Sequence, residues 1–98
     1  MKTSFKKLIK SNPEVLVDFF AEWCGPCKML TPILEQVKEE LGDQIRIVKI
    51  DVDKNSKVAD KYRVRGVPTM ILFKNGKQVW RQSGVVQRNE LIEIINSH

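Results

Sequence analysis

The chain is poor in cysteine, glycine, proline and histidine: its 98 residues include two, five, four and one of them. Two cysteines are too few for the disulfide framework of a small secreted protein. Little glycine and proline argues against a fibrous or disordered chain, and 42% hydrophobic with 30% charged residues is ordinary for a globular protein. We therefore expect one domain over residues 1–98, with a core that needs no disulfide staples.

Long apolar runs are also missing. No stretch of 18 apolar residues is present, so we expect no membrane-spanning helix and no membrane partner. The first residues, MKTSFKKLIKSN, are positively charged but lack the apolar core of a signal peptide. These features predict a cytoplasmic protein, unless a leader has been removed.

The net charge of +5 is compatible with nucleic acid as a partner. The densest basic stretch, residues 54–65, is interrupted by Asp60 and contains Tyr62 as its only aromatic residue. A surface for single-stranded nucleic acid needs several aromatic residues among its basic ones. We therefore expect a solvated face and no nucleic acid partner.

The first half of the chain predicts a strand between two helices. The run VLVDFF at 15–20 is nearly all apolar, which is typical of a central strand buried on both faces. A helix of regular apolar spacing begins at or just after Cys24 and stops at Gly42. Pro32 inside it predicts a kink rather than a break. Before the strand we expect a short helix at 5–9, with Thr3 or Ser4 as its N-cap.

The second half predicts a mixed sheet. Asn75-Gly76 is the dipeptide of a two-residue hairpin turn, so the strands on either side of it must be antiparallel. A parallel half joined to an antiparallel half predicts an α/β fold. The elements expected here are a strand at 45–52, a short helix at about 56–62, strands at 70–73 and 78–81, and a helix at about 88–96.

Three uses compete for the cysteine pair in AEWCGPCKM at 21–29. A closed metal site needs four ligands, and beyond the pair the chain offers only His98, so we expect no metal. A structural disulfide closing a four-residue loop stabilises by about 1.9 kcal/mol, against about 4.7 kcal/mol for a loop of 100 residues. A redox dithiol that needs no further cofactor is therefore the favoured interpretation.

Position gives the two cysteines different roles. Cys24 lies at the start of a helix, where unpaired amides and the helix dipole lower the thiol pKa, so its exposed sulfur would attack as a thiolate. Cys27, one turn further, is sheltered and would resolve the mixed disulfide. Gly25 lets a partner backbone approach, and Pro26 loses no hydrogen bond in the first turn. Trp23 could pack in the core or cover the site.

Asp18 lies in the buried strand, where desolvation should raise its pKa and make it a proton acceptor near neutral pH. The alternative is a carboxylate satisfied by hydrogen bonds or by a lysine, with no catalytic part. Lys49 in the next parallel strand is the natural partner, although a lysine in a strand points to solvent by default. Val67-Pro68 opens a later strand, and the residues alone leave its isomer open.

These motifs resemble the thioredoxin family over nearly the whole chain. The resemblance implies the thioredoxin fold, with a mixed sheet of four or five strands flanked by helices on both faces. It also implies a protein-disulfide reductase that works as a monomer on disulfide-containing proteins and is recharged by a thioredoxin reductase. The residues that carry it are WCGPC at 23–27, Asp18, Lys28, Pro32, Lys49, RGVPT at 65–69, FKNG at 73–76 and Gly84.

The resemblance further implies roles for individual residues. Cys24 and Cys27 would form the redox-active disulfide, Asp18 and Lys49 would form a buried pair that manages the proton of Cys27, and Pro68 would be cis. The surface that accepts substrate proteins would consist of Trp23, Gly25, Pro26, Val67, Pro68, Gly84 and Val85.

The sequence departs from the family pattern at three places. Phe20 replaces a common tryptophan, Ser83 replaces an apolar residue and makes one edge of the docking surface more polar, and few residues precede Thr3 for a first edge strand. Four strands instead of five are therefore expected if that strand is missing. An oxidase or isomerase, and a binding module with an incidental redox pair, remain the rival functions.

Overall fold

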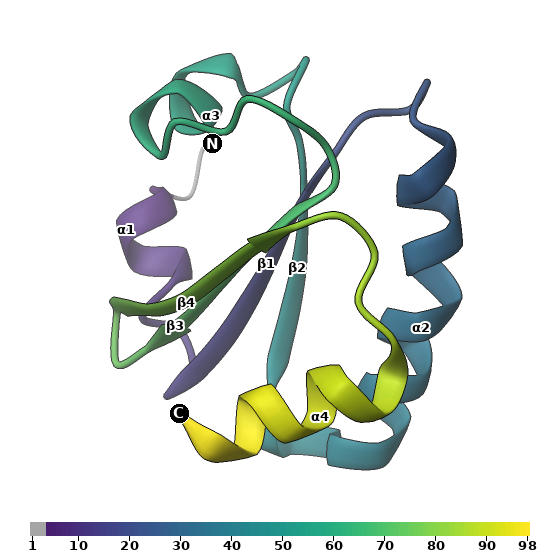
Figure 1. Cartoon of the computed structure of the whole chain (residues 1–98). Coiled ribbons are helices and arrows are strands. Elements are labelled where there is room, and N and C mark those ends of the chain that lie inside the picture. The colour runs from purple at the N-terminus through teal and green to yellow at the C-terminus, as the bar shows by residue number, and fades with distance from the viewer. Residues whose placement is uncertain (1–3) are drawn as a thin grey trace.

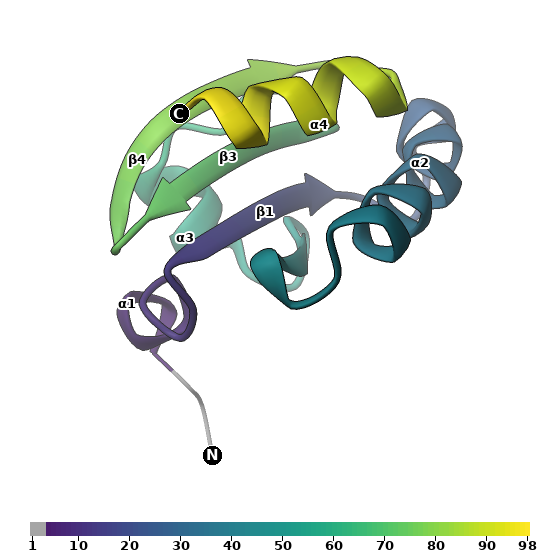
Figure 2. The same ribbon diagram turned by 90° about the horizontal axis from the view of Figure 1, so that it is seen from below.

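The computed structural model describes residues 4–98, and these form a four-stranded mixed sheet between two helical layers (Figure 1). The strand order is β2-β1-β3-β4, which puts β1 in the interior as expected. Figure 2 shows β4, β3 and β1 in this order. The strands are β1 (Glu14–Phe20), β2 (Arg46–Asp51), β3 (Thr69–Lys74) and β4 (Lys77–Ser83).

The pairing of the strands confirms the mixed sheet. β1 runs parallel to β2 and antiparallel to β3, and β3 runs antiparallel to β4. Asn75 and Gly76 join β3 to β4 with φ angles of 53° and 81°, the left-handed conformation that this dipeptide favours. The described residues contain four strands, so β2 is an edge strand within residues 4–98.

The helices also lie close to their expected positions. Ser4 caps α1, its hydroxyl accepting a hydrogen bond from the Lys7 amide at 3.2 Å, while Thr3 lies outside the described residues. The long helix α2 continues through Pro32 and ends at Gly42, whose φ is 55°. Among residues 4–98 no helix is both long and apolar enough to cross a bilayer. The helical elements are α1 (Phe5–Leu8), α2 (Gly25–Leu41), the 3-10 turn η1 (Gly42–Gln44), α3 (Ser56–Lys61) and α4 (Arg88–Ser97).

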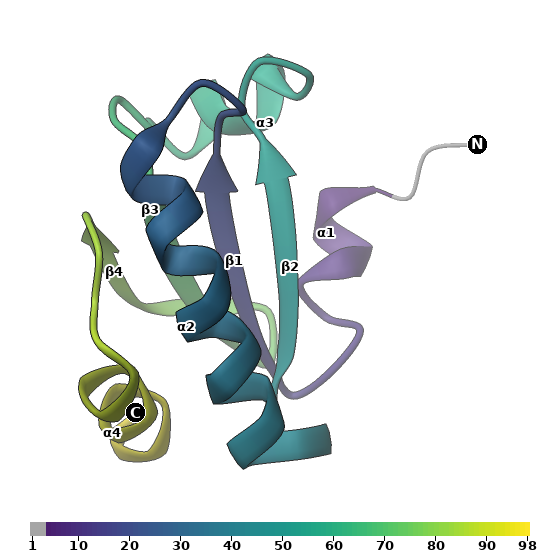
Figure 3. The same cartoon turned by 90° about the vertical axis from the view of Figure 1, so that its right-hand side faces the viewer.

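Each face of the sheet has its own apolar core. Helices α2 and α4 cover one face with Leu30, Leu34 and Leu91 among their fully packed side chains. Helices α1 and α3 cover the other face, where the buried Phe19 and Phe73 pack against their apolar residues. Figure 3 shows α2 lying along the sheet with its N-terminal end beside the arrowheads of β1 and β2. This packing fixes where the chain passes from β1 into α2, which is where both cysteines lie.

Leu91→Ala tests the core under α4. Leu91 is fully buried, so removing its side chain should lower the free energy of unfolding by about 2–5 kcal/mol. Denaturant unfolding measures the loss, and Glu93→Ala, on the exposed side of the same helix, should change it by no more than about 0.5 kcal/mol. Equal effects of the two substitutions would contradict the packing described.

Candidate active site

The cysteine pair lies at the N-terminus of α2 and is joined as a disulfide. Cys24 is the N-cap residue, and its Sγ accepts a hydrogen bond from the Cys27 backbone amide at 3.1 Å. A sulfur in this position replaces the usual oxygen of a capping side chain, because it accepts the hydrogen bond of an amide in the first turn that has no partner within the helix. The arrangement favours negative charge on Cys24 when the disulfide is reduced.

The expectation that the Cys24 sulfur is exposed is wrong for this oxidised state. Cys24 and Cys27 are 3% and 4% exposed, so accessibility does not distinguish them. The reason is the loop before β3, which covers the pair and brings the Val67 carbonyl oxygen to 3.6 Å from the Cys24 sulfur. What distinguishes the cysteines is their place on the helix, with Cys24 at the N-cap and Cys27 one turn inside.

The Val67–Pro68 bond is cis, as the family resemblance implied. Gly84, with a φ of 95°, donates its amide to the Pro68 carbonyl at 2.9 Å. This bond joins the end of β4 to the loop beside the cysteines. The structure thus brings together Cys24, Val67, Pro68 and Gly84, which are distant in sequence, while Val85 is half-buried and packs against the core under α2 and α4.

Trp23 lies at the edge of this region and is 71% exposed, so it does not pack in the core. Its indole Nε1 donates to Asp53 Oδ2 at 2.9 Å, which holds the ring on the surface. Together with Val67 and Arg65, the ring lines a hollow of about 110 Å³. Gly25 and Pro26 are exposed at the start of the helix.

The side chains of Thr69 and Arg81 fix the loop that carries Val67, and the sequence did not reveal these contacts. The Thr69 hydroxyl donates to the Gly66 carbonyl at 2.7 Å and lies 2.8 Å from the Ser83 hydroxyl. From β4, the Arg81 guanidinium donates to the carbonyls of Tyr62 and Arg63. Ser83 therefore does more than make the surface polar, because its hydroxyl connects β4 to the loop.

Asp18 is 0% exposed, and neither of its carboxylate oxygens has a hydrogen-bond partner. Burial raises the pKa of Asp18 to about 6, and the positive charge of Lys49 opposes that rise. No protein group among residues 4–98 donates a hydrogen bond to the carboxylate, so of the non-catalytic alternative only the part in which a lysine satisfies Asp18 remains.

The expected buried pair of Asp18 and Lys49 is wrong in one respect, because Lys49 is exposed. The two residues lie opposite each other in the β1–β2 register, but the Lys49 ammonium donates to Thr31 Oγ1 at 2.9 Å. It also lies 4.8 Å from the centre of the Phe20 ring. The physical reason is hydration: a long side chain can keep its ammonium at the surface, whereas burial would remove its water.

A cavity of about 250 Å³ lies between α2 and β2, next to Lys49. Cys27 lines this cavity, and Cys24 is not among its lining residues. Its lining residues are Phe20, Ala21, Glu22, Cys27, Lys28, Thr31 and Lys49. Within residues 4–98 no cluster of three or more potential metal ligands is found.

The raised pKa of Asp18 predicts a pH-dependent stability. Below the ordinary aspartate value of 3.8 both folded and unfolded protein keep the proton; as the pH rises, the unfolded carboxyl ionises first, and stability falls until the folded group ionises at about 6. For oxidised Asp18→Asn, the gain in unfolding free energy over wild type should be about 2–3 kcal/mol larger at pH 8 than at pH 4. Urea unfolding at both pH values measures it, and a pH-independent difference would contradict the assignment.

Comparison with known proteins agrees with this geometry. The thioredoxin family pattern, described as "Thioredoxin", matches residues 1–97. A thioredoxin of Rickettsia bellii is 44% identical over 97 residues, covering 99% of this chain and 92% of the relative. The solved structure of a mutant thioredoxin from Halobacterium salinarum superposes with a TM-score of 0.88 at 41% identity, covering 99% of this chain and 84% of that one.

A further solved structure is described as the structural basis of thiol resolution in a yeast mitochondrial 1-Cys peroxiredoxin through glutathione and thioredoxin systems. It superposes with a TM-score of 0.88 at 35% identity and covers 100% of this chain and 91% of that one. The match of fold and sequence extends over nearly the whole chain and includes the cysteine pair at the start of α2. This chain therefore belongs to the thioredoxin family and is a protein thiol-disulfide oxidoreductase.

Proposed function

We propose that the protein reduces disulfides of other proteins by dithiol–disulfide exchange, with Cys24 attacking and Cys27 resolving. The observation that carries this proposal is the hydrogen bond from the Cys27 amide to Cys24 Sγ at 3.1 Å. It supports Cys24 as the sulfur that the helix N-terminus stabilises as a thiolate. The thiolate is the nucleophile in disulfide exchange.

In the first step the Cys24 thiolate attacks one sulfur of the substrate disulfide. A bond forms between Cys24 and that sulfur, the substrate S–S bond breaks, and the other substrate cysteine leaves as a thiolate that takes a proton from solvent. Docking would use the surface around Val67, where main-chain groups lie next to the Cys24 sulfur. The residues proposed for docking are Trp23, Gly25, Pro26, Val67, Pro68, Gly84 and Val85.

In the second step Cys27 loses its proton and attacks the Cys24 sulfur of the mixed disulfide. Asp18 is the proposed proton acceptor, because its carboxylate is unpartnered and its pKa of about 6 leaves it ionised but basic at neutral pH. The Cys24–substrate bond breaks, and the second substrate cysteine leaves as a thiolate. Two electrons have then passed to the substrate, and the protein carries the Cys24–Cys27 disulfide seen in this structure.

A thioredoxin reductase is the proposed source of electrons for the next cycle, since the family generally receives them from such an enzyme. The peroxiredoxin study among the matched structures supports disulfide-containing proteins as the class of substrate. We further propose that residues 1–98 act as one domain, as a monomer in the cytoplasm, with neither nucleic acid nor membrane as a partner.

Cys24→Ser should abolish insulin disulfide reduction, because the attacking thiolate is lost. Cys27→Ser should still attack but should accumulate the mixed disulfide, which gel electrophoresis without reductant detects. A reduction potential of about −270 mV would agree with a reductase, whereas one of about −120 mV would indicate an oxidase. Turnover retained by Cys24→Ser would overturn the proposal.

Asp18→Asn should slow resolution of the mixed disulfide at neutral pH by about 10²-fold, the lower end of what a positioned base contributes. Rapid mixing with a chromogenic disulfide separates this step from the attack by Cys24, whose rate should stay within about threefold of wild type. Resolution rates equal to wild type from pH 6 to pH 9 would contradict the role of Asp18.

A further inference from the structure

We propose that Thr31 is a positioning residue that holds the Lys49 ammonium in place on the strand next to Asp18 and so sets the pH range in which Cys27 resolves a mixed disulfide. The inference rests on the proposed function. It concerns a side chain that neither the cysteine motif nor the expected pair of Asp18 and Lys49 includes.

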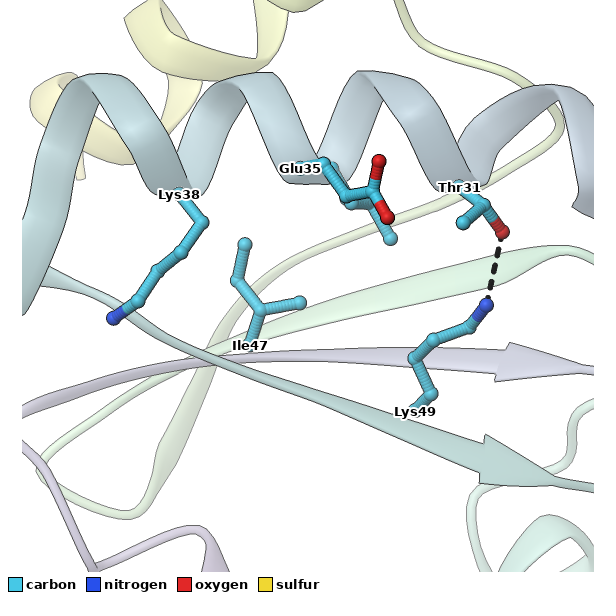
Figure 4. Close-up of a pocket in the computed structure, with 6 residues that line it drawn as sticks. Thr31, Glu35, Lys38, Ile47 and Lys49 are labelled. Carbon is cyan, nitrogen blue, oxygen red and sulfur yellow. Dashed lines mark hydrogen bonds between the residues drawn. The ribbon is translucent and has the colours of Figure 1, made fainter.

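Thr31 lies one turn after Cys27 in α2, and its hydroxyl makes two hydrogen bonds. It donates to the Cys27 carbonyl at 3.3 Å and accepts from Lys49 Nζ at 2.9 Å. Figure 4 shows the two side chains pointing toward each other from α2 and β2. Because the hydroxyl proton is directed along the helix, the oxygen lone pairs face the strand and are available to the ammonium.

Lys49 needs such a contact to have a defined position. Its side chain is exposed and has four rotatable carbon–carbon bonds, so an untethered ammonium would spread over many rotamers in water. The Phe20 ring is the second contact, 4.8 Å from Nζ. The hydroxyl and the ring together hold the charge at the cavity that also reaches Cys27.

The held charge acts on Asp18 through space. Asp18 and Lys49 are register partners on neighbouring strands, yet neither Asp18 oxygen accepts a hydrogen bond from the ammonium. Burial raises the pKa of Asp18, and Lys49 is the charge that lowers it again. The amount by which Lys49 lowers the Asp18 pKa depends on the average position of its ammonium. The Thr31 hydroxyl controls that position.

Other charged side chains line the spaces beside Lys49. Glu35 of α2 lines the groove that Thr31 and Lys49 also line. Glu22 and Lys28 line the cavity beside Cys27, from the loop after β1 and from α2. On the β3 side the register partner is the uncharged Met70. The cysteine pair on α2 is oxidised in this structure and carries no charge. Lys49 is therefore the cation on the strand next to Asp18, and the Thr31 hydroxyl is its hydrogen-bond acceptor beside the Phe20 ring.

Loss of the hydroxyl should move the Asp18 pKa upward. Without its tether the ammonium spends more time in solvent, the ionised carboxylate loses part of its stabilisation, and a larger fraction of Asp18 stays protonated near neutral pH. Resolution by Cys27 should then slow at pH 6–7 and stay near the wild-type rate at pH 9, where the carboxylate is ionised in both proteins.

Thr31→Val tests the inference because it keeps the shape of the side chain and removes the hydroxyl, whereas Thr31→Ser keeps the hydroxyl. Carbon NMR of the Asp18 carboxyl in the oxidised full chain measures the pH midpoint of its titration directly. We expect an upward shift for Thr31→Val that does not exceed the shift for Lys49→Met, and a midpoint within the fitting error of wild type for Thr31→Ser. Lys38→Met is the matched control. Lys38 lines the groove between α2 and β2 with Thr31 and Lys49 and carries the same charge, but its ammonium binds the carbonyls of Gly42 and Ile45.

An unchanged or lowered Asp18 midpoint in Thr31→Val, or an equal shift in Lys38→Met, would overturn the role of Thr31. The NMR titration needs no substrate, so its result does not depend on the proposed function, which the turnover of Cys24→Ser tests separately. A second readout is the pH profile of mixed-disulfide resolution. Its acidic limb should move to higher pH in Thr31→Val and should stay at the wild-type pH in Thr31→Ser.

Discussion

Burial of β1 between two helical layers is the constraint on which the rest of the structure depends. The strand is covered on both faces, and it delivers the chain directly to the N-terminus of α2. That geometry places Cys24 at the helix cap and Asp18 within the sheet behind it. The sulfur proposed to attack thus accepts a hydrogen bond from a main-chain amide, while the pKa of the proposed proton acceptor is raised by the same packing that makes the fold.

The site conflicts with the stability of the fold. An unpartnered carboxylate in a central strand lowers the stability of the fold at every pH at which it is ionised, and the two apolar cores must offset this loss of stability. Lys49 relieves only part of it, because a complete ion pair would draw the ammonium out of water. A distant, held charge leaves Asp18 basic enough to accept a proton near neutral pH.

Features set by short stretches of sequence could be predicted, and features set by side-chain rotamers across elements could not. The central position of β1, the start of α2 at Cys24 and the turn at Asn75-Gly76 follow from apolar runs and turn chemistry. The burial of Cys24 follows from the loop before β3 that lies over it in space. The bond of Thr31 to Lys49 joins residues 18 positions apart, and no local pattern marks it.

The open edges of the sheet have a consequence for how copies of the chain meet. Within residues 4–98, β2 and β4 each have one side without a neighbouring strand, which invites pairing between molecules. Exposed cations occur on both strands: Arg46 and Lys49 on β2, Lys77 and Arg81 on β4. Two copies approaching edge to edge bring like charges together, so the lysine proposed to act on Asp18 also opposes self-association, and concentrated salt weakens that repulsion.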